Sequence, residues 1–141
     1  SDVVTFHVPA LPETIHLLNK DRIAKLKPGV HIINTSRGAV IDTNALIWGL
    51  KQGIIAGAAL DVLEEEGLLK HDEELALLAS EHPNPEQLRL VLEDQYLIDH
   101  PGVIITPHNA FNTHEALARI AQTTLENMQA FIAGKPQNVV G

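Results

Sequence analysis

The chain has 141 residues, enough for one domain with a hydrophobic core, and its 45% hydrophobic content and mean hydropathy of +0.03 are typical of a soluble globular protein. It contains no cysteine, which excludes disulfides and thiolate metal sites. The net charge is −8 and no basic cluster offsets it, so we expect neither nucleic acid nor an anionic membrane surface as a partner. No apolar run approaches the ~20 residues of a membrane span, no signal peptide is recognisable, and we expect a cytoplasmic protein.

Strand and helix patterns alternate through the first sixty residues. In order, the sequence predicts a strand over 2–8, a short helix over 21–26 capped by Asn19 or Asp21, a strand over 30–34, a helix over 43–52 and a strand over 54–60. Thr43 is the expected cap of the second helix, and Gly53 ends it. This alternation indicates βαβ units and a mainly parallel sheet, and therefore an α/β fold.

The composition changes between residues 64 and 100, which form an acidic, leucine-rich insert with a helical period. Two prolines within 82–85 divide it into two predicted helices. A short strand over 103–106 follows, and then a long amphipathic helix over 114–133 that is capped by Asn112 or Thr113. Gly134 and Pro136 stop that helix.

The first strand is a nearly continuous apolar run, which is typical of a parallel strand covered on both faces. Such a strand rarely begins a domain. We therefore expect the chain to be part of a longer protein.

Three groups that could carry chemistry follow three successive predicted strands. Arg37 comes after the strand over 30–34, an acidic run comes after the strand over 54–60, and His108 comes after the strand over 103–106. Ligands of open α/β sheets bind outside the carboxyl ends of the strands, so these groups could converge on one small anionic substrate. The position alone does not choose among Glu64, Glu65 and Glu66 for the carboxylate.

Each of these groups also has a simpler interpretation. Arg37 could be a surface arginine in a weak salt bridge, His108 is one of eight histidines, and a run of glutamates is usually a solvated face. Arg37 is favoured by the small residues around it, which let backbone approach a ligand, and His108 by the proline before it. We expect no metal site, because the sequence has no dense set of ligands. The glycines at 49, 53 and 57 do not have the spacing of a phosphate loop.

Four segments together resemble the D-isomer-specific 2-hydroxyacid dehydrogenase family, and in particular its D-lactate dehydrogenase-like branch. They are Ser1–Pro9 with Thr14, Lys27–Asp42, Gly57–Val62 with Glu66, and Thr106–Ala110. The resemblance extends over nearly the whole chain. It implies the second half of a Rossmann-type, doubly wound parallel sheet with a long C-terminal helix, in a longer two-domain protein. Residues 1–134 would be part of an NAD-binding domain, and 135–141 a tail.

The resemblance also implies roles for individual residues. The family glutamate lies five residues after the aspartate Asp61, which points to Glu66. Arg37 would bind the substrate carboxylate, His108 would act as acid and base, and Glu66 would tune it. The cofactor-binding residues would be Val8, Pro9, Thr35, Ser36, Arg37, Asp61 and His108.

The implied function is an NAD-dependent oxidoreductase of D-2-hydroxy acids and 2-keto acids, with NADP left open as the cofactor. The alternative is a non-catalytic NAD-sensing or assembly module with the same fold. Retention of all three catalytic residue types favours the enzyme, and the lack of a glycine-rich phosphate loop favours the alternative. Apolar faces that the rest of a longer protein would cover lead us to expect a homodimer.

Overall fold

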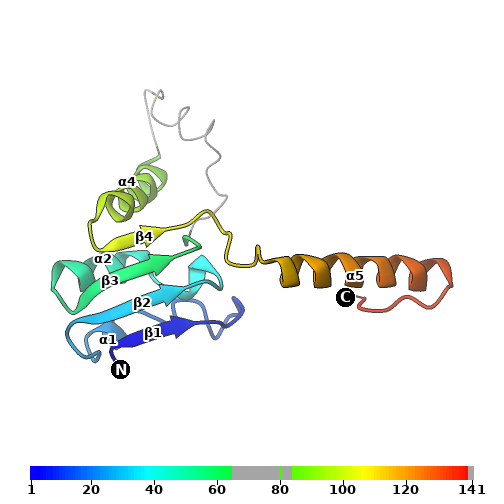
Figure 1. The fold of residues 1–141 in the computed structure, drawn as a ribbon. Helices are drawn as coiled ribbons and strands as arrows, with labels where there is room; N and C mark the ends of the chain where they lie inside the picture. The colour runs from blue at the N-terminus through cyan, green and yellow to red at the C-terminus, as the bar shows by residue number, and fades with distance from the viewer. Residues whose placement is uncertain (65–79, 81–83, 140–141) are drawn as a thin grey trace. The chain divides into compact units, whose positions relative to one another are not determined.

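The computed structural model describes residues 1–64, 80 and 84–139 (Figure 1). They belong to two compact units, Ser1–His108 and Asn109–Gly141. The predicted division into a domain over 1–134 and a tail over 135–141 stays a prediction about the complete protein. The residue chosen as catalytic carboxylate, Glu66, lies outside the described residues.

The first unit is built on a four-stranded sheet whose order follows the sequence, β1-β2-β3-β4. The strands are β1 (Val3–Phe6), β2 (Val30–Asn34), β3 (Ile55–Leu60) and β4 (Val103–Ile105). Every neighbouring pair is parallel. This confirms the α/β fold with a parallel sheet that the alternating pattern predicts.

The connections between the strands carry the helices. They are α1 (Lys20–Ile23), the short 3-10 helix η1 (Gly38–Val40), α2 (Thr43–Lys51) and α4 (Pro85–Asp99). The helix predicted for the second half of the acidic insert is α4, which begins after the cap Asn84. The helix predicted for the first half of the insert lies outside the described residues.

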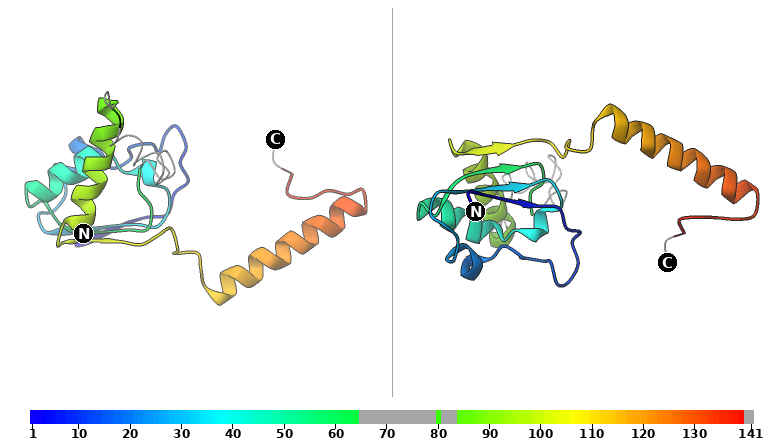
Figure 2. Two further views of the ribbon diagram at one scale, coloured as in Figure 1. Left: turned by 90° about the horizontal axis from the view of Figure 1, so that it is seen from above. Right: turned by 60° about the horizontal axis from the view of Figure 1, so that its bottom comes forward.

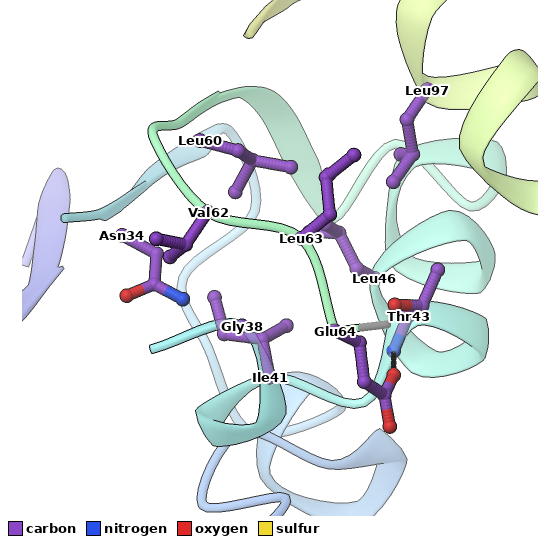
Figure 3. A pocket seen from close by; sticks show the side chains of 10 residues that line it. All are labelled: Asn34, Gly38, Ile41, Thr43, Leu46, Leu60, Val62, Leu63, Glu64 and Leu97. Atoms are coloured by element: carbon purple, nitrogen blue, oxygen red, sulfur yellow. Dashed lines mark hydrogen bonds between the residues drawn. The ribbon is translucent and has the colours of Figure 1, made fainter. Parts of the chain in front are cut away.

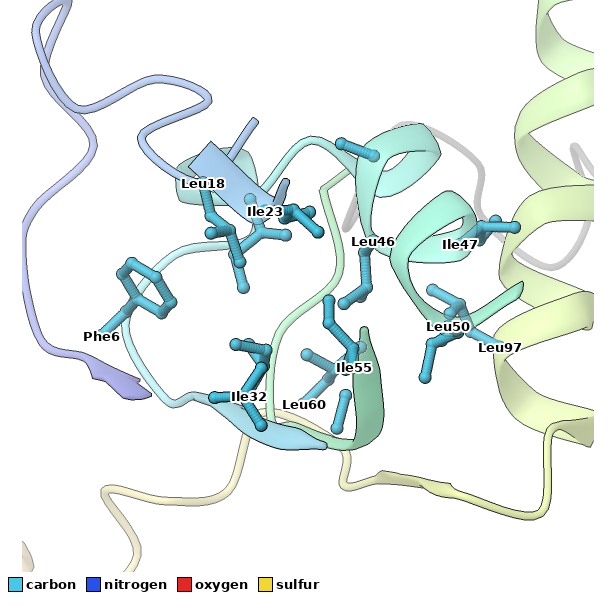
Figure 4. Packing of buried hydrophobic residues seen from close by; sticks show 14 of the residues in the cluster. Phe6, Leu18, Ile23, Ile32, Leu46, Ile47, Leu50, Ile55, Leu60 and Leu97 are labelled. Carbon is cyan, nitrogen blue, oxygen red and sulfur yellow. The ribbon is translucent and has the colours of Figure 1, made fainter. Parts of the chain in front are cut away.

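One face of the sheet is covered by helices and forms the core (Figure 2). Phe6 and Ile32 from the strands pack with Leu46 of α2 and Leu97 of α4, and all four are buried (Figure 4). On the other face Val3 is 51% exposed and Ile104 65% exposed. The expectation that β1 is covered on both faces is therefore wrong for this structure, because helices described in the first unit pack against one side only.

The helix caps follow the sequence with one correction. Asn19 caps α1, and Gly53 ends α2 with a φ of +68°, which a glycine adopts without strain. The cap of α2 is Asp42 rather than Thr43: the Asp42 side chain accepts a hydrogen bond of 3.0 Å from the Ala45 amide. Thr43 is instead the first residue of the helix, and it is buried.

The second unit consists of helix α5 (His114–Ile132) and the residues around it. Thr113 caps the helix by accepting a hydrogen bond of 3.1 Å from the Ala116 amide. No side chain of α5 is buried, although the helix carries large apolar residues: Leu117, Ile120, Leu125, Met128 and Phe131. Among the helices that the structure describes, none is long and apolar enough to span a bilayer.

Candidate functional site at the carboxyl edge of the sheet

The four strands end in one row across the sheet. Phe6 pairs with Asn34, Asn34 with Leu60, and Leu60 with Ile105. The strands are parallel, so the four loops that follow this row leave from the same edge (Figure 1). The register therefore brings the loops that carry Arg37, Asp61 and His108 together at one edge of the first unit.

The loop after β2 is shaped by Asn34, which is 1% exposed. Its side-chain oxygen accepts hydrogen bonds from the Ser36 amide at 3.1 Å and the Ser36 hydroxyl at 2.8 Å. Its side-chain nitrogen donates to the Arg37 carbonyl at 2.9 Å. One buried amide thus fixes the three residues after it and leaves the Arg37 side chain exposed at the edge.

The loops after β1 and β2 enclose an open hollow of about 270 Å³. Its lining consists of His7, Val8, Pro9, Thr35, Ser36 and Arg37. Five of the seven residues predicted to bind the cofactor therefore line one hollow. Val8 and Pro9 give it an apolar wall, and two hydroxyls and a guanidinium give it polar groups.

The remaining two predicted residues, Asp61 and His108, meet at the loops after β3 and β4. Asp61 is 5% exposed, and its carboxylate accepts a hydrogen bond of 2.5 Å from the Thr106 hydroxyl. The His108 amide donates to the Asp61 carbonyl and to the Thr106 carbonyl, each at 2.9 Å. His108 has a φ of +49°, in the left-handed region that few non-glycine residues adopt. These backbone bonds hold it there, and its side chain is exposed.

The loop after β3 is packed directly on the loop after β2. A Cβ atom on Gly38 would lie 1.7 Å from the Leu63 carbonyl oxygen and 2.5 Å from the Glu64 nitrogen. Gly38 thus permits a close approach of two backbones. The sequence predicts that the small residues of this loop let the backbone approach a ligand. At Gly38 that space is occupied by the backbone of the neighbouring loop.

The site also contains His16, which the sequence analysis does not single out, and Glu64, which it leaves as one of three candidates for the carboxylate. One Glu64 carboxylate oxygen accepts a hydrogen bond of 2.7 Å from the Thr43 amide (Figure 3). The other oxygen contacts the His16 ring. The cavity beside Glu64, lined among others by Asn34 and Thr43, measures about 10 Å³, room for one water at most. Glu64 is thus engaged within the fold. Its acidic neighbours Glu65 and Glu66 lie outside the described residues.

The comparisons with known proteins agree with this architecture. Residues 1–110 match the family model described as "D-isomer specific 2-hydroxyacid dehydrogenase, NAD binding domain". An aromatic 2-oxoacid reductase of Clostridium sporogenes is 40% identical over 134 residues, which is 93% of this chain and 37% of that protein.

Two solved structures are similar along most of the chain. A D-lactate dehydrogenase of Treponema pallidum gives a TM-score of 0.79 at 36% identity and matches 98% of this chain and 39% of its own. The D-lactate dehydrogenase of Aquifex aeolicus, solved with NAD and lactic acid, gives 0.77 at 38% identity and matches 96% of this chain and 38% of its own. This chain therefore spans less than two fifths of the length of these relatives.

Proposed function

Since this chain belongs to the D-isomer specific 2-hydroxyacid dehydrogenase family, we propose that the complete protein containing it is an NAD-dependent oxidoreductase that interconverts D-2-hydroxy acids and 2-keto acids. The observation that carries the proposal is the row formed by Phe6, Asn34, Leu60 and Ile105. Because the strands end in register, a guanidinium and an imidazole lie on loops at one edge of one sheet. A small acid needs both groups: one to bind its carboxylate and one to exchange its hydroxyl proton.

The roles follow from the chemistry of the side chains. In the reduction direction, Arg37 binds the substrate carboxylate, because its planar fork can form two parallel hydrogen bonds with it. Bound NADH would supply the hydride that reduces C2. His108 donates a proton to the C2 oxygen as the carbonyl electron pair moves onto that oxygen, which gives the hydroxyl group. We assign Glu66 to His108 because a nearby carboxylate favours the imidazolium form.

The residues described here fit part of a nicotinamide dinucleotide. Val8 and Pro9 offer an apolar wall to a ring, and Thr35 and Ser36 add hydroxyls to the lining of the same hollow. The chain has no glycine-rich turn to hold a pyrophosphate. We therefore expect the chain by itself to bind NADH poorly, and calorimetric titration would measure this. Tight stoichiometric binding would contradict our assignment of the cofactor site.

The experiment on the complete protein is an NADH oxidation assay with a panel of 2-keto acids that includes pyruvate, phenylpyruvate and glyoxylate, with chiral analysis of the product. We expect reduction of at least one member to the D-hydroxy acid. Arg37→Lys, which keeps the charge but loses the fork, should raise KM for the keto acid, and Arg37→Ala should raise it further. His114→Ala, at an exposed helix start, is the matched control. NADH binding without reduction of any member would favour the NAD-sensing module, and an L-product would contradict the proposal.

We further propose that the complete protein is a cytoplasmic homodimer. Apolar side chains are exposed on α5 and on one face of the sheet in this chain, and any part of these surfaces that the rest of the protein leaves uncovered would support association. Analytical ultracentrifugation measures the assembly, and a monomer at high concentration would contradict the dimer. Cell fractionation tests the location.

A further inference from the structure

Glu64 is held from two sides by parts of the chain that are distant in sequence. It comes three residues after Asp61 in the loop after β3, and its side chain is 17% exposed. One oxygen accepts the amide of Thr43 at 2.7 Å, at the start of α2. The other contacts Nε2 of His16, in the loop after β1. One carboxylate therefore connects the loop after β3 with the start of α2 and with the loop after β1.

The partner at Thr43 is suited to a carboxylate. Thr43 is the first residue of α2, and the first amides of a helix have no acceptor within the helix. The N-terminus of a helix also carries partial positive charge, which stabilises a nearby anion. Thr43 is buried, so loss of Glu64 would leave an amide donor away from water.

The partner at His16 is itself fixed by backbone bonds. Its amide donates to the Ala39 carbonyl at 2.8 Å, and two residues later the Leu18 amide donates to the Val40 carbonyl at 3.0 Å. His16 has a φ of +49°, so the chain turns at this residue. The imidazole is therefore presented to Glu64 from a segment that is paired with the η1 region.

The close contact at Gly38 gives these bonds a consequence for the site. Gly38 follows Arg37 directly, and the backbone of Leu63 and Glu64 lies against it. Any shift of Glu64 would therefore move the loop that carries Asp61 relative to the loop that carries Arg37.

We infer that Glu64 is a positioning residue, whose carboxylate clamps the loop after β3 onto the start of α2 and onto His16. The clamp fixes Asp61 relative to Arg37. Its effect on turnover rests on the proposed function. Both oxygens of Glu64 have partners within the fold, so its role is to hold other residues in place.

The kinetic test uses the complete protein with Glu64→Ala, Glu64→Gln and Glu86→Ala, the last as a control on an exposed glutamate of α4. Rates are normalised to the number of sites that bind NADH. Glu64→Ala should lower kcat/KM for the keto acid by about tenfold or more, and the Kd for NADH should change by less than about twofold, because a misplaced group costs orientation rather than cofactor contacts. Glu64→Gln should restore most of the activity, since its amide oxygen can still accept from Thr43. Unchanged kinetics in Glu64→Ala, or a Glu64→Gln variant as impaired as Glu64→Ala, would overturn the inference.

A second measurement does not depend on activity. Amide hydrogen exchange of the parent and Glu64→Ala proteins should show faster exchange at Thr43 by about tenfold or more, and unchanged exchange at Leu97 in the core of α4. If Glu64→Ala does not fold, His16→Asn serves instead, because asparagine tolerates a positive φ but is too short to replace the imidazole. It should accelerate the same amide and lower kcat/KM to a smaller extent. If no keto acid is reduced by the parent, the proposed function fails while the exchange result still decides the clamp. Unchanged exchange at Thr43 in both variants would overturn the clamp.

Discussion

Two loops at the same edge of the sheet, one after β2 and one after β4, are held in different ways. Asn34 shapes the first loop from within, through three hydrogen bonds to residues 36 and 37. The second loop is held by its neighbour: Asp61, in the loop after β3, accepts the Thr106 hydroxyl with its side chain and the His108 amide with its carbonyl.

Two groups at one edge of the sheet can therefore depend on different residues for their position. Asn34 lies three positions before Arg37 and supports that loop from within, in addition to the contact of Gly38 with the loop after β3. The His108 amide instead donates to the Asp61 carbonyl in the loop after β3 as well as to Thr106, and these bonds support a φ of +49°. We therefore expect local variants to affect the first loop, and variants of the adjacent strand end to affect the second.

The largest expected effect distinguishes the role of His108 in the second loop from that of Arg37 in the first. In the complete protein, His108→Ala should lower kcat by about 10²–10⁴-fold, which is the usual loss for a missing general acid or base. The KM for the keto acid should change little, whereas Arg37→Ala should mainly raise that KM. Steady-state kinetics of both variants measure this split. If both variants showed the same pattern, the two loops would not carry separate roles.

A smaller effect tests the internal support of the first loop. Asn34→Ala should lower the free energy of unfolding by about 1–3 kcal/mol, because the Arg37 carbonyl and the Ser36 amide lose their partner next to the core. It should also weaken keto acid binding, since the Arg37 backbone is no longer fixed. Urea unfolding and substrate titration measure the two effects.

The control for Asn34 is Ser36→Ala, which removes the hydroxyl bond but keeps the amide bond to the same oxygen. It should cost clearly less stability than Asn34→Ala. Equal losses in the two variants would mean that the buried amide does not organise the loop.

The support of the second loop should respond to Thr106. Thr106→Val removes the hydroxyl that donates to the buried Asp61 carboxylate, with little change of volume, and should cost about 1 kcal/mol of stability. Thr106→Ser keeps the hydroxyl donor, so its stability and kcat should be closer to those of the parent protein. Thermal unfolding and kcat of both variants test this. A serine variant as impaired as the valine variant would point to lost packing instead.

Local patterns in the sequence were sufficient for the sheet and for part of the edge. The alternation of strands and helices predicts the parallel sheet, and the strand predicted over 30–34 coincides with β2. Parallel strands direct their carboxyl ends to one edge, so the convergence of the Arg37 and His108 loops follows from topology. β1 extends over Val3–Phe6 and is shorter than the predicted strand over 2–8. The cap of α2 differs from prediction because both Asp42 and Thr43 have a side chain that can cap a helix.

The rest of the edge depends on contacts that no local pattern records. His16 and Glu64 are 48 residues apart, and nothing in the sequence indicates that their side chains meet. The sequence predicts that Gly38 lets the backbone approach a ligand, but in the structure it lets the backbone of Leu63 approach instead. Asn34 could have been recognised, since an asparagine before small polar residues is typical of a side-chain-capped turn.

The smallest expected effect concerns a residue of α4 that belongs to neither of the two loops. Glu93, on α4, is a mostly buried carboxylate that Arg89 contacts at 2.8 Å, and its other oxygen has no hydrogen-bond partner among the described residues. Burial raises the pKa of Glu93 above its usual 4.5, and the charges of Glu64 and Asp42 add to the rise, while Arg89 lowers it in part. Glu93→Gln should change the free energy of unfolding in a pH-dependent way and leave kcat unchanged, unlike the variants of the two loops.

The pH dependence of that stability has a definite sign. A carboxyl with a raised folded pKa binds its proton more tightly in the folded chain, so the stability it contributes is present below the unfolded pKa and is lost as the pH rises through the folded pKa. Glutamine does not titrate. The free energy of unfolding of Glu93→Gln minus that of the parent should therefore increase as the pH rises above 4.5 and level off beyond the folded pKa. Urea unfolding across this range measures the difference, with the exposed Glu86→Gln on the same helix as control. A difference that stays flat, or that falls with pH, would mean that Glu93 is not a buried titrating group.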